Sequence, residues 1–226
     1  MANQPESGEV LLQTGQSGDG IVVVGGGGHA KVVISILRKL CYCILGYTDL
    51  KDHGLVLGVP YLGADRELAA LATGPKKLNA VLAVGQVGLG ETRYELWTRL
   101  HSPALSFPLI VSPDAVVNEG VLGGEAAVVM DGAVVNSGAT IGRAVIVNTN
   151  STVEHDVVLE DWVHVAPGAT ISGGVTVGRF SMIGAGTTVI EGVKIAASCL
   201  VGAGATVVRD LTEPGVYVGS PARRIK

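Results

Sequence analysis

A strict six-residue repeat occupies the second half of the chain and limits what it can fold into. Every sixth residue from Val129 to Val207 is aliphatic, over fourteen consecutive positions without an insertion. The residue two places before each of them is small or β-branched, from Ala127 to Ala205. A period of six excludes an α-helix, whose turn takes about 3.6 residues, and it differs from the alternation of an amphipathic strand. The repeat predicts a parallel β-helix of four to five triangular coils.

The composition suits a narrow core with many turns and excludes several classes of partner. The chain has 33 glycines, only 4% aromatic residues and a net charge of −4, so no basic face for nucleic acid or an anionic membrane is expected. Cys41, Cys43 and Cys199 have the spacing of neither a disulfide framework nor a metal site. We find no signal peptide and no apolar run of ~18 residues. We therefore expect a cytoplasmic protein without a metal.

The chain divides into three expected segments. Residues 1–18 are polar and are expected to form a disordered leader. Residues 19–108 alternate strand-like and helix-like patterns, with strands at 21–24, 43–47 and 80–84 and helices after the first glycine run, at 65–72 and at 91–100. This alternation predicts a Rossmann-like α/β domain, for which the glycine-rich turn described next suggests a nucleotide-sugar as ligand. Residues 109–226 are expected to form the β-helix with a C-terminal tail.

A glycine-rich turn joins the first predicted strand to the first predicted helix. Gly25 and Gly27 open a G-x-G-x-x-A pattern, Gly28 and His29 follow, and Asp49 lies about 20 residues further on. Glycines at this point let backbone N–H groups approach a pyrophosphate at a helix N-terminus. A domain of about 90 residues is small for a dinucleotide, which favours a single sugar nucleotide. A tight turn without any ligand remains the alternative.

From about residue 20 to residue 226 the chain resembles the hexapeptide-repeat acyltransferases. Within them it is most similar to the sugar O- and N-acetyltransferases typified by sialic acid O-acetyltransferase and the bacterial nucleotide-4-aminosugar N-acetyltransferases. The resemblance is carried by Asn148 to Asp156, by a second histidine nine residues after the first, and by an imperfect V-x-G-x-P-A-[KR] ending that Val216 opens. It implies a left-handed β-helix, a homotrimer with active sites between subunits, acetyl-CoA as co-substrate, and a role in surface glycan biosynthesis.

The resemblance also implies roles for residues of the β-helix. His155 lies in a turn with its side chain expected outward, where an imidazole with a pKa near 6.5 can act as the general base. Asp156 is expected to orient it, as a carboxylate does in a Ser-His-Asp triad. Asn148 and His164 are expected to contact the sugar, and His164 the acetyl group as well. The alternatives are an exposed turn histidine at 155 and a structural one at 164.

The contacts to acetyl-CoA are expected on later coils and in the tail. The backbone N–H of Gly173 is the expected donor to the oxyanion of the tetrahedral intermediate. Ala185 and Ala203 share one hexad position on successive coils and are expected to contact CoA. Gly219 and Pro221 lie where the chain leaves the β-helix, which in the resembled family is near the CoA adenine.

These features favour an acetyl-CoA-dependent N-acetyltransferase that acts by direct transfer on the amine of a nucleotide-linked 4-amino-(4,6-dideoxy) sugar. An O-acetyltransferase of sialic acid or another sugar would use the same residues and stays open, as does a non-catalytic trimer that binds sugar nucleotides. A γ-class carbonic anhydrase needs three zinc histidines, and the repeat region has two. A sugar-1-phosphate nucleotidyltransferase would have a longer N-terminal domain with a G-x-G-T-R loop, which is absent here.

Overall fold

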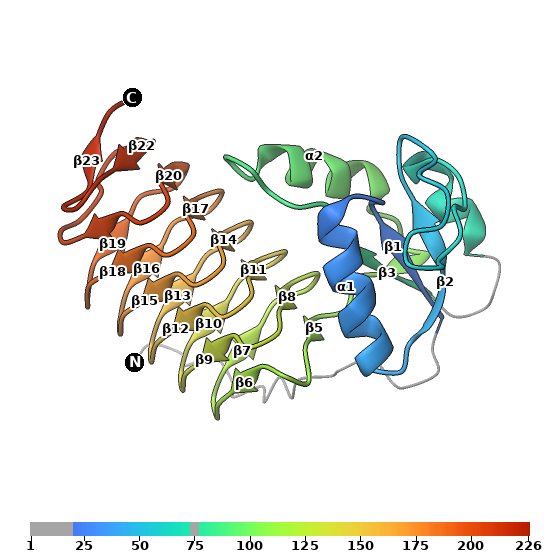
Figure 1. Cartoon of the computed structure of the whole chain (residues 1–226), viewed down its shortest axis with the longest axis horizontal. Coiled ribbons are helices and arrows are strands. Elements are labelled where there is room, and N and C mark those ends of the chain that lie inside the picture. The colour runs from blue at the N-terminus through green and yellow to red at the C-terminus, as the bar shows by residue number, and fades with distance from the viewer. Residues whose placement is uncertain (1–19, 73–76) are drawn as a thin grey trace, which may run out of the picture.

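The chain folds into an α/β domain that lies against a left-handed parallel β-helix, as the sequence predicts (Figure 1). The computed structural model describes residues 20–72 and 77–226. The expected leader at 1–18 lies outside the described residues. The strands of the two domains follow one another directly, since the α/β sheet ends with Leu105–Ser106 and the β-helix begins with Ile110–Val111.

The α/β domain is a four-stranded parallel sheet in the order β2-β1-β3-β4. Its strands are β1 (Gly20–Val24), β2 (Cys43–Thr48), β3 (Leu78–Leu82) and β4 (Leu105–Ser106), and its helices are α1 (Gly28–Lys39) and α2 (Glu91–Leu100). The segment expected as a helix at 65–72 forms a 3-10 helix, η1 (Asp65–Leu71).

Both faces of this sheet are covered, because successive residues of a strand point to opposite sides. Ile21 and Val23 pack with the apolar side of α1, whereas Val22 and Val24 pack with η1 and α2. All four side chains are fully buried. The continuous valine run of β1 is therefore that of a central strand with helices on both faces.

The β-helix has three flat faces built from strands of mostly two residues. The face that the α/β domain covers, called the covered face below, contains β5 (Ile110–Val111), β8 (Val128–Val129), β11 (Ile146–Val147), β14 (His164–Val165), β17 (Met182–Ile183), β20 (Cys199–Val201), β22 (Gly215–Val218) and β23 (Arg223–Arg224). The second face contains β6 (Val116–Val117), β9 (Val134–Val135), β12 (Thr152–Val153), β15 (Thr170–Ile171), β18 (Thr188–Val189) and β21 (Thr206–Val207). The third face contains β7 (Leu122–Gly123), β10 (Thr140–Ile141), β13 (Val158–Leu159), β16 (Thr176–Val177) and β19 (Lys194–Ile195).

The six-residue repeat forms the core of the β-helix. Paired residues are eighteen positions apart, as in Thr152 with Thr170, so three hexads make one coil. All fourteen aliphatic residues from Val129 to Val207 point inward, and none is more than 3% exposed. The small or β-branched residues two places earlier belong to the same core.

The β-helix has about six coils, of which the fourteen regular hexads make between four and five, as expected for that stretch. The additional coil precedes the regular repeat and starts at β5. The repeat is hidden there because Gly123 occupies a position that an aliphatic residue would fill. A Cβ atom at Gly123 would overlap the side chain of Leu109, which packs against the core in its place.

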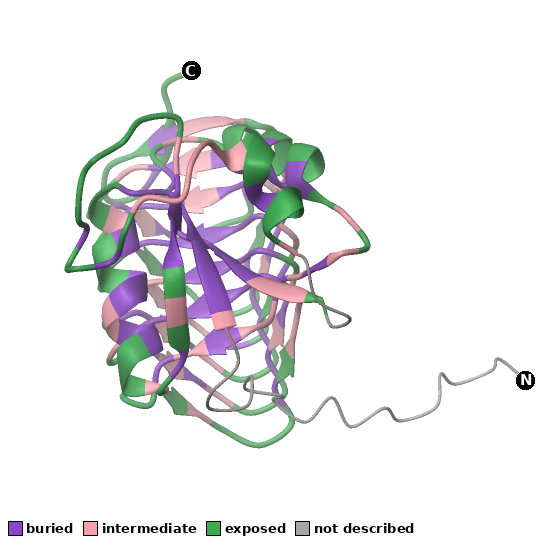
Figure 2. Ribbon diagram, turned by 90° about the vertical axis from the view of Figure 1, so that its right-hand side faces the viewer, coloured by how far each residue is buried: buried purple, intermediate pink, exposed green. Residues whose placement is uncertain are grey.

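The α/β domain packs on the covered face and on the corner that joins it to the third face. Val128 and Ile146 of the covered face share a cluster with α1, and Trp162 at that corner shares one with α2. Lys39 at the end of α1 lies 2.6 Å from both Asp114 and Asp131 of the first coils. Figure 2 shows buried strands at the centre, between the exposed outer sides of the helices. The corner between the second and third faces therefore lies across the triangular coil from the α/β domain.

Candidate active site

The glycine turn leaves the N-terminus of α1 open to an anion. Gly25 has φ +111° and packs against the Ala83 carbonyl, so it must be glycine. A Cβ atom at Gly27 or Gly28 would meet nothing within 4 Å, and both residues are exposed. The N-cap Gly27 makes no side-chain capping bond, and the first turn of α1 contains no acidic residue. Unpaired N–H groups and the helix dipole at this end favour a phosphate.

Asp49, which directly follows β2, is hydrogen-bonded to the backbone of this turn. Its Oδ2 accepts the Gly26 N–H at 2.7 Å, and His53 Nε2 lies 3.6 Å from the same oxygen. The His53 ring also lies against Gly26, because a Cβ atom there would be 2.8 Å from His53 Cδ2. Sequence reasoning assigned His53 no role. Its position four residues after the acid was the available signal.

His155 and Asp156 form an exposed dyad at the corner between the second and third faces, after β12. The Nδ1–H of His155 donates to Asp156 Oδ2 at 2.9 Å. The His155 side chain is 59% exposed. The hydrogen bond to Asp156 raises the pKa of His155, and the nearby carboxylates of Glu154 and Glu191 also raise it. With Nδ1 held by the carboxylate, Nε2 is the atom left to accept a proton.

His164 points outward from β14, as expected, but the α/β domain covers it and leaves only 5% of it exposed. Its Nδ1–H donates to the Gln86 carbonyl at 3.1 Å, and its Nε2 accepts from Asn148 Nδ2 at 3.0 Å. Burial, and then the charge of Arg93, lower the pKa of His164 to about 4. The ring is therefore neutral at pH 7 and ties the two domains together.

Half-buried His29 and buried Arg93 of the α/β domain lie beside His164. His29 follows the glycine turn, and burial followed by the charge of Arg93 lowers its pKa to about 4. Arg93 of α2 is 2% exposed, donates to the Ala144 carbonyl at 2.9 Å, and lies 5.8 Å from the centre of the Trp162 ring. Sequence reasoning missed Arg93, because an arginine in a helical pattern is usually exposed.

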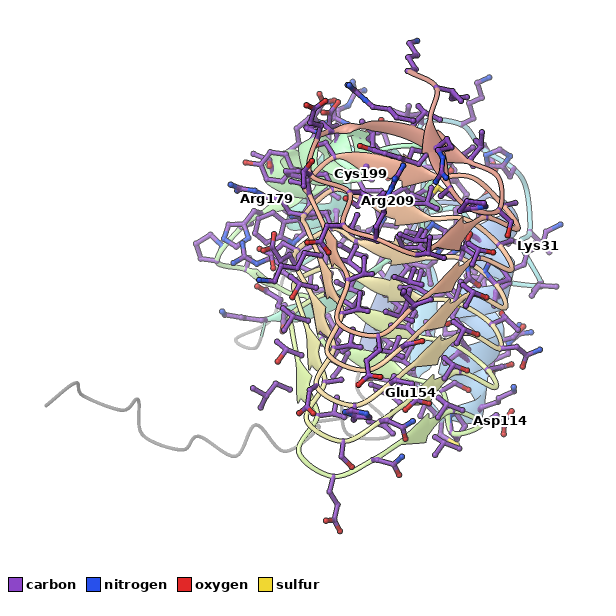
Figure 3. All side chains as sticks on the ribbon, turned by 90° about the vertical axis from the view of Figure 1, so that its left-hand side faces the viewer. Lys31, Asp114, Glu154, Arg179, Cys199 and Arg209 are labelled. Carbon is purple, nitrogen blue, oxygen red and sulfur yellow. The ribbon has the colours of Figure 1, made fainter. Side chains whose placement is uncertain are left out.

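Asn148 ends the neighbouring strand β11 and is half-buried. Its Oδ1 accepts the Thr149 N–H at 2.8 Å while its amide donates to His164. The structure thus brings Asn148, His164 and His29 to the junction of the domains. It does not bring His155 to them within one chain, because the dyad occupies the corner opposite the covered face. Figure 3 views the molecule from the side away from the α/β domain and labels Glu154, the residue before His155.

The residues expected to contact acetyl-CoA lie on the coils that follow His155 and in the C-terminal tail. Gly173 is one coil after His155 at the same corner, and it is buried. Its N–H donates none of the backbone hydrogen bonds found in the described part of the chain. Ala185 and Ala203 are exposed, one above the other, at the corner that joins the covered and second faces. Gly219 and Pro221 are exposed beyond β22.

Within residues 20–72 and 77–226, no helix is long and apolar enough to cross a membrane. No group of three or more His, Cys, Asp or Glu side chains in these residues is placed to hold a metal ion.

Comparisons with family profiles match both domains. The profile of the PglD N-terminal domain matches residues 20–95. The profile of the bacterial transferase hexapeptide, with six repeats, matches residues 138–173. A comparison with curated protein sequences gave no match.

Several solved structures are similar to this chain over nearly their full length. PerB from Caulobacter crescentus, in complex with CoA and GDP-perosamine, is 37% identical with a TM-score of 0.85, covering 92% of this chain and 97% of that one. The acetyltransferase domain of PglB from Neisseria gonorrhoeae, in complex with acetyl coenzyme A, is 32% identical with a TM-score of 0.84, covering 92% and 100%. WeeI from Acinetobacter baumannii, at 24% identity and a TM-score of 0.78 over 91% and 99%, shares the fold.

Proposed function

Because this chain belongs to the hexapeptide-repeat family of sugar O- and N-acetyltransferases, we propose that it acetylates the amine of a nucleotide-linked 4-amino sugar. It is an acetyl-CoA-dependent acyltransferase. The similarity to an N-acetyltransferase that was crystallised with GDP-perosamine favours an amine over a hydroxyl as the acceptor. We place the reaction in the cytoplasm, in the biosynthesis of a surface glycan.

The His155–Asp156 dyad is the observation that carries the proposal. The neutral amine of the sugar must lose a proton as it attacks a thioester, and the free Nε2 of His155 can accept that proton. Asp156 holds the tautomer that leaves Nε2 unprotonated and stabilises the imidazolium that forms. Exposure of the ring leaves room for both substrates beside it.

Transfer is direct, with no acyl-enzyme. The amine nitrogen attacks the thioester carbonyl carbon as His155 removes its proton, so that a C–N bond forms and the carbonyl oxygen becomes an oxyanion. The N–H of Gly173, which donates no backbone hydrogen bond among the described residues, is our candidate donor to that oxyanion. The C–S bond then breaks, and the CoA thiolate leaves and receives the proton. Ala185, Ala203 and the tail at Gly219 and Pro221 are our candidates for holding CoA.

We propose that the nucleotide binds to the α/β domain with its diphosphate at the open N-terminus of α1. Gly27 and Gly28 give the phosphates room, and Asp49 fixes the turn beneath them. Asn148 and His164 lie at the domain junction, and we keep them as candidates for contacting the sugar. The dyad of the same chain lies across the triangular coil, so the nucleotide of one subunit must meet His155 of another. A homotrimer provides that arrangement.

A thiol-release assay with acetyl-CoA and a panel of acceptors tests the substrate class. The panel contains UDP-, dTDP- and GDP-linked 4-amino sugars, GDP-perosamine among them, together with the matching 4-hydroxy sugars and free sialic acid. We expect turnover with one or more of the amino sugars and none with their hydroxy counterparts. Turnover of sialic acid or the hydroxy sugars alone would move the assignment to O-acetylation. Acetyl-CoA binding without turnover of any acceptor would indicate a binding protein.

A further inference from the structure

Gly173 lies beneath the His155 ring, and its backbone conformation does not explain why this residue is a glycine. The turn places residues 137, 155, 173 and 191 at one corner on successive coils, and the other three positions hold serine, histidine and glutamate. The corner therefore accepts side chains. Gly173 also lacks the positive φ found at its neighbour Gly174, which has φ +65°. Neither the corner nor the backbone requires a glycine at 173.

The imidazole of His155 fills the space that a side chain at 173 would need. A Cβ atom built on Gly173 would lie 2.5 Å from His155 Nε2 and 2.6 Å from its Cε1, distances that real Cβ atoms do not show. Gly173 is buried although Gly174 beside it is exposed. The ring of His155 thus lies directly on the backbone of the next coil.

Two contacts then define the orientation of an otherwise exposed side chain. Asp156 holds Nδ1 through a hydrogen bond of 2.9 Å, and Gly173 supports the edge that contains Nε2. A methyl group at 173 would displace the ring, since the imidazole is the end of a rotatable side chain whereas the coil backbone is fixed by its ladder of hydrogen bonds.

We propose that Gly173 is a positioning residue for the reaction. Because it has no side chain, the His155 ring can pack on its backbone, and this contact keeps the ring hydrogen-bonded to Asp156 with Nε2 available to the acceptor. The proposal rests on the assignment of His155 as general base for its catalytic consequence, but the contact itself does not. It is separate from the candidate role of the Gly173 N–H, which alanine would keep.

The test is Gly173→Ala, with the pKa of His155 followed by NMR in the full-length protein labelled at its histidines and assigned with His155→Asn. We expect the pKa to fall towards its ordinary value, because the displaced ring loses Asp156. We also expect kcat to fall on the order of 100-fold, as for a ring misplaced by about 1 Å, with KM for acetyl-CoA changed less than about threefold.

Gly174→Ala is the matched control in the same turn. Its Cβ atom would meet nothing within 4 Å, so it strains the backbone without touching the ring. We expect it to lower Tm and to leave the pKa of His155 unchanged. An unchanged pKa of His155 in Gly173→Ala, whatever the kcat of that variant, would overturn the proposal that Gly173 positions the ring. A lowered pKa with full kcat would support the positioning by Gly173 and would instead contradict the general-base role of His155.

Discussion

His155 and His164 are nine residues apart, and their surroundings change their pKa values in opposite directions. A carboxylate raises the pKa of exposed His155, while burial lowers that of His164 to about 4. The sequence identified both histidines but not this difference. The covering of His164 depends on the α/β domain, whose contact with β14 joins residues 78 positions apart. No local pattern reports such a contact.

The dyad makes a prediction for the pH dependence of kcat/KM. A general base works only when neutral, so activity rises as the pH passes the pKa of His155. Asp156→Asn removes the carboxylate whose hydrogen bond and charge raise this pKa. We expect the acidic limb of the pH profile to move to lower pH and the maximal rate to fall. A limb at the same pH in the variant would show that another group titrates.

Buried His164 makes a prediction for acid stability. Its pKa in the folded protein, about 4, is below its ordinary 6.5, so between these values the unfolded chain binds more protons and stability falls as the pH falls. We expect Tm to decrease by roughly 5–10 °C from pH 7 to pH 4, and His164→Gln to remove part of that decrease. His29 contributes a similar part. His155→Gln is the control, since its raised pKa has the opposite sign and its loss should not flatten the curve.

At the scale of elements, the β-helix was predictable because the buried position of every hexad holds an aliphatic residue. Each of these residues contacts only its own and neighbouring coils, so the six-residue period is visible in the sequence itself. The first coil lies within the range expected for the β-helix but does not continue the period, because Leu109, from outside the hexad, fills the place left by Gly123. The 3-10 geometry of η1 was missed, since a short apolar pattern does not distinguish it from an α-helix.

Neighbouring residues of one strand test this account of the core. Ile195 of β19 points inward and is 3% exposed, whereas Lys194 points outward. We expect Ile195→Ala to cost about 2–5 kcal/mol in the free energy of unfolding and Lys194→Ala less than about 0.5 kcal/mol. Chemical denaturation measures both. Equal losses would contradict the assignment of the faces.

At the scale of the whole molecule, the dyad lies across the coil from the α/β domain, so the site that we propose needs residues of more than one chain. The sequence predicted the two halves of the site, and the resemblance implied that they meet between subunits. The distance between them in one chain emerged only from the packing of the α/β domain on the covered face. We expect a particle of three times 23.0 kDa by light scattering.

Subunit mixing tests whether the site is shared between chains. His155→Asn removes the base, and Gly28→Glu places a negative charge at the open end of α1, where its side chain has space. Each variant alone should be inactive. Trimers refolded or co-expressed from both should regain part of the wild-type activity, because some interfaces then combine an intact dyad with an intact turn. If mixed trimers form without any gain, the site lies within one chain.

We propose above all that the chain places an acetyl group on the amine of a nucleotide-linked sugar. The most direct measurement is mass spectrometry of the product formed from acetyl-CoA and GDP-perosamine or another accepted 4-amino sugar nucleotide, before and after mild alkali. We predict one added acetyl group, stable to alkali as an amide, absent with His155→Asn although that variant still binds both substrates. An alkali-labile ester, or full product from His155→Asn, would contradict the account.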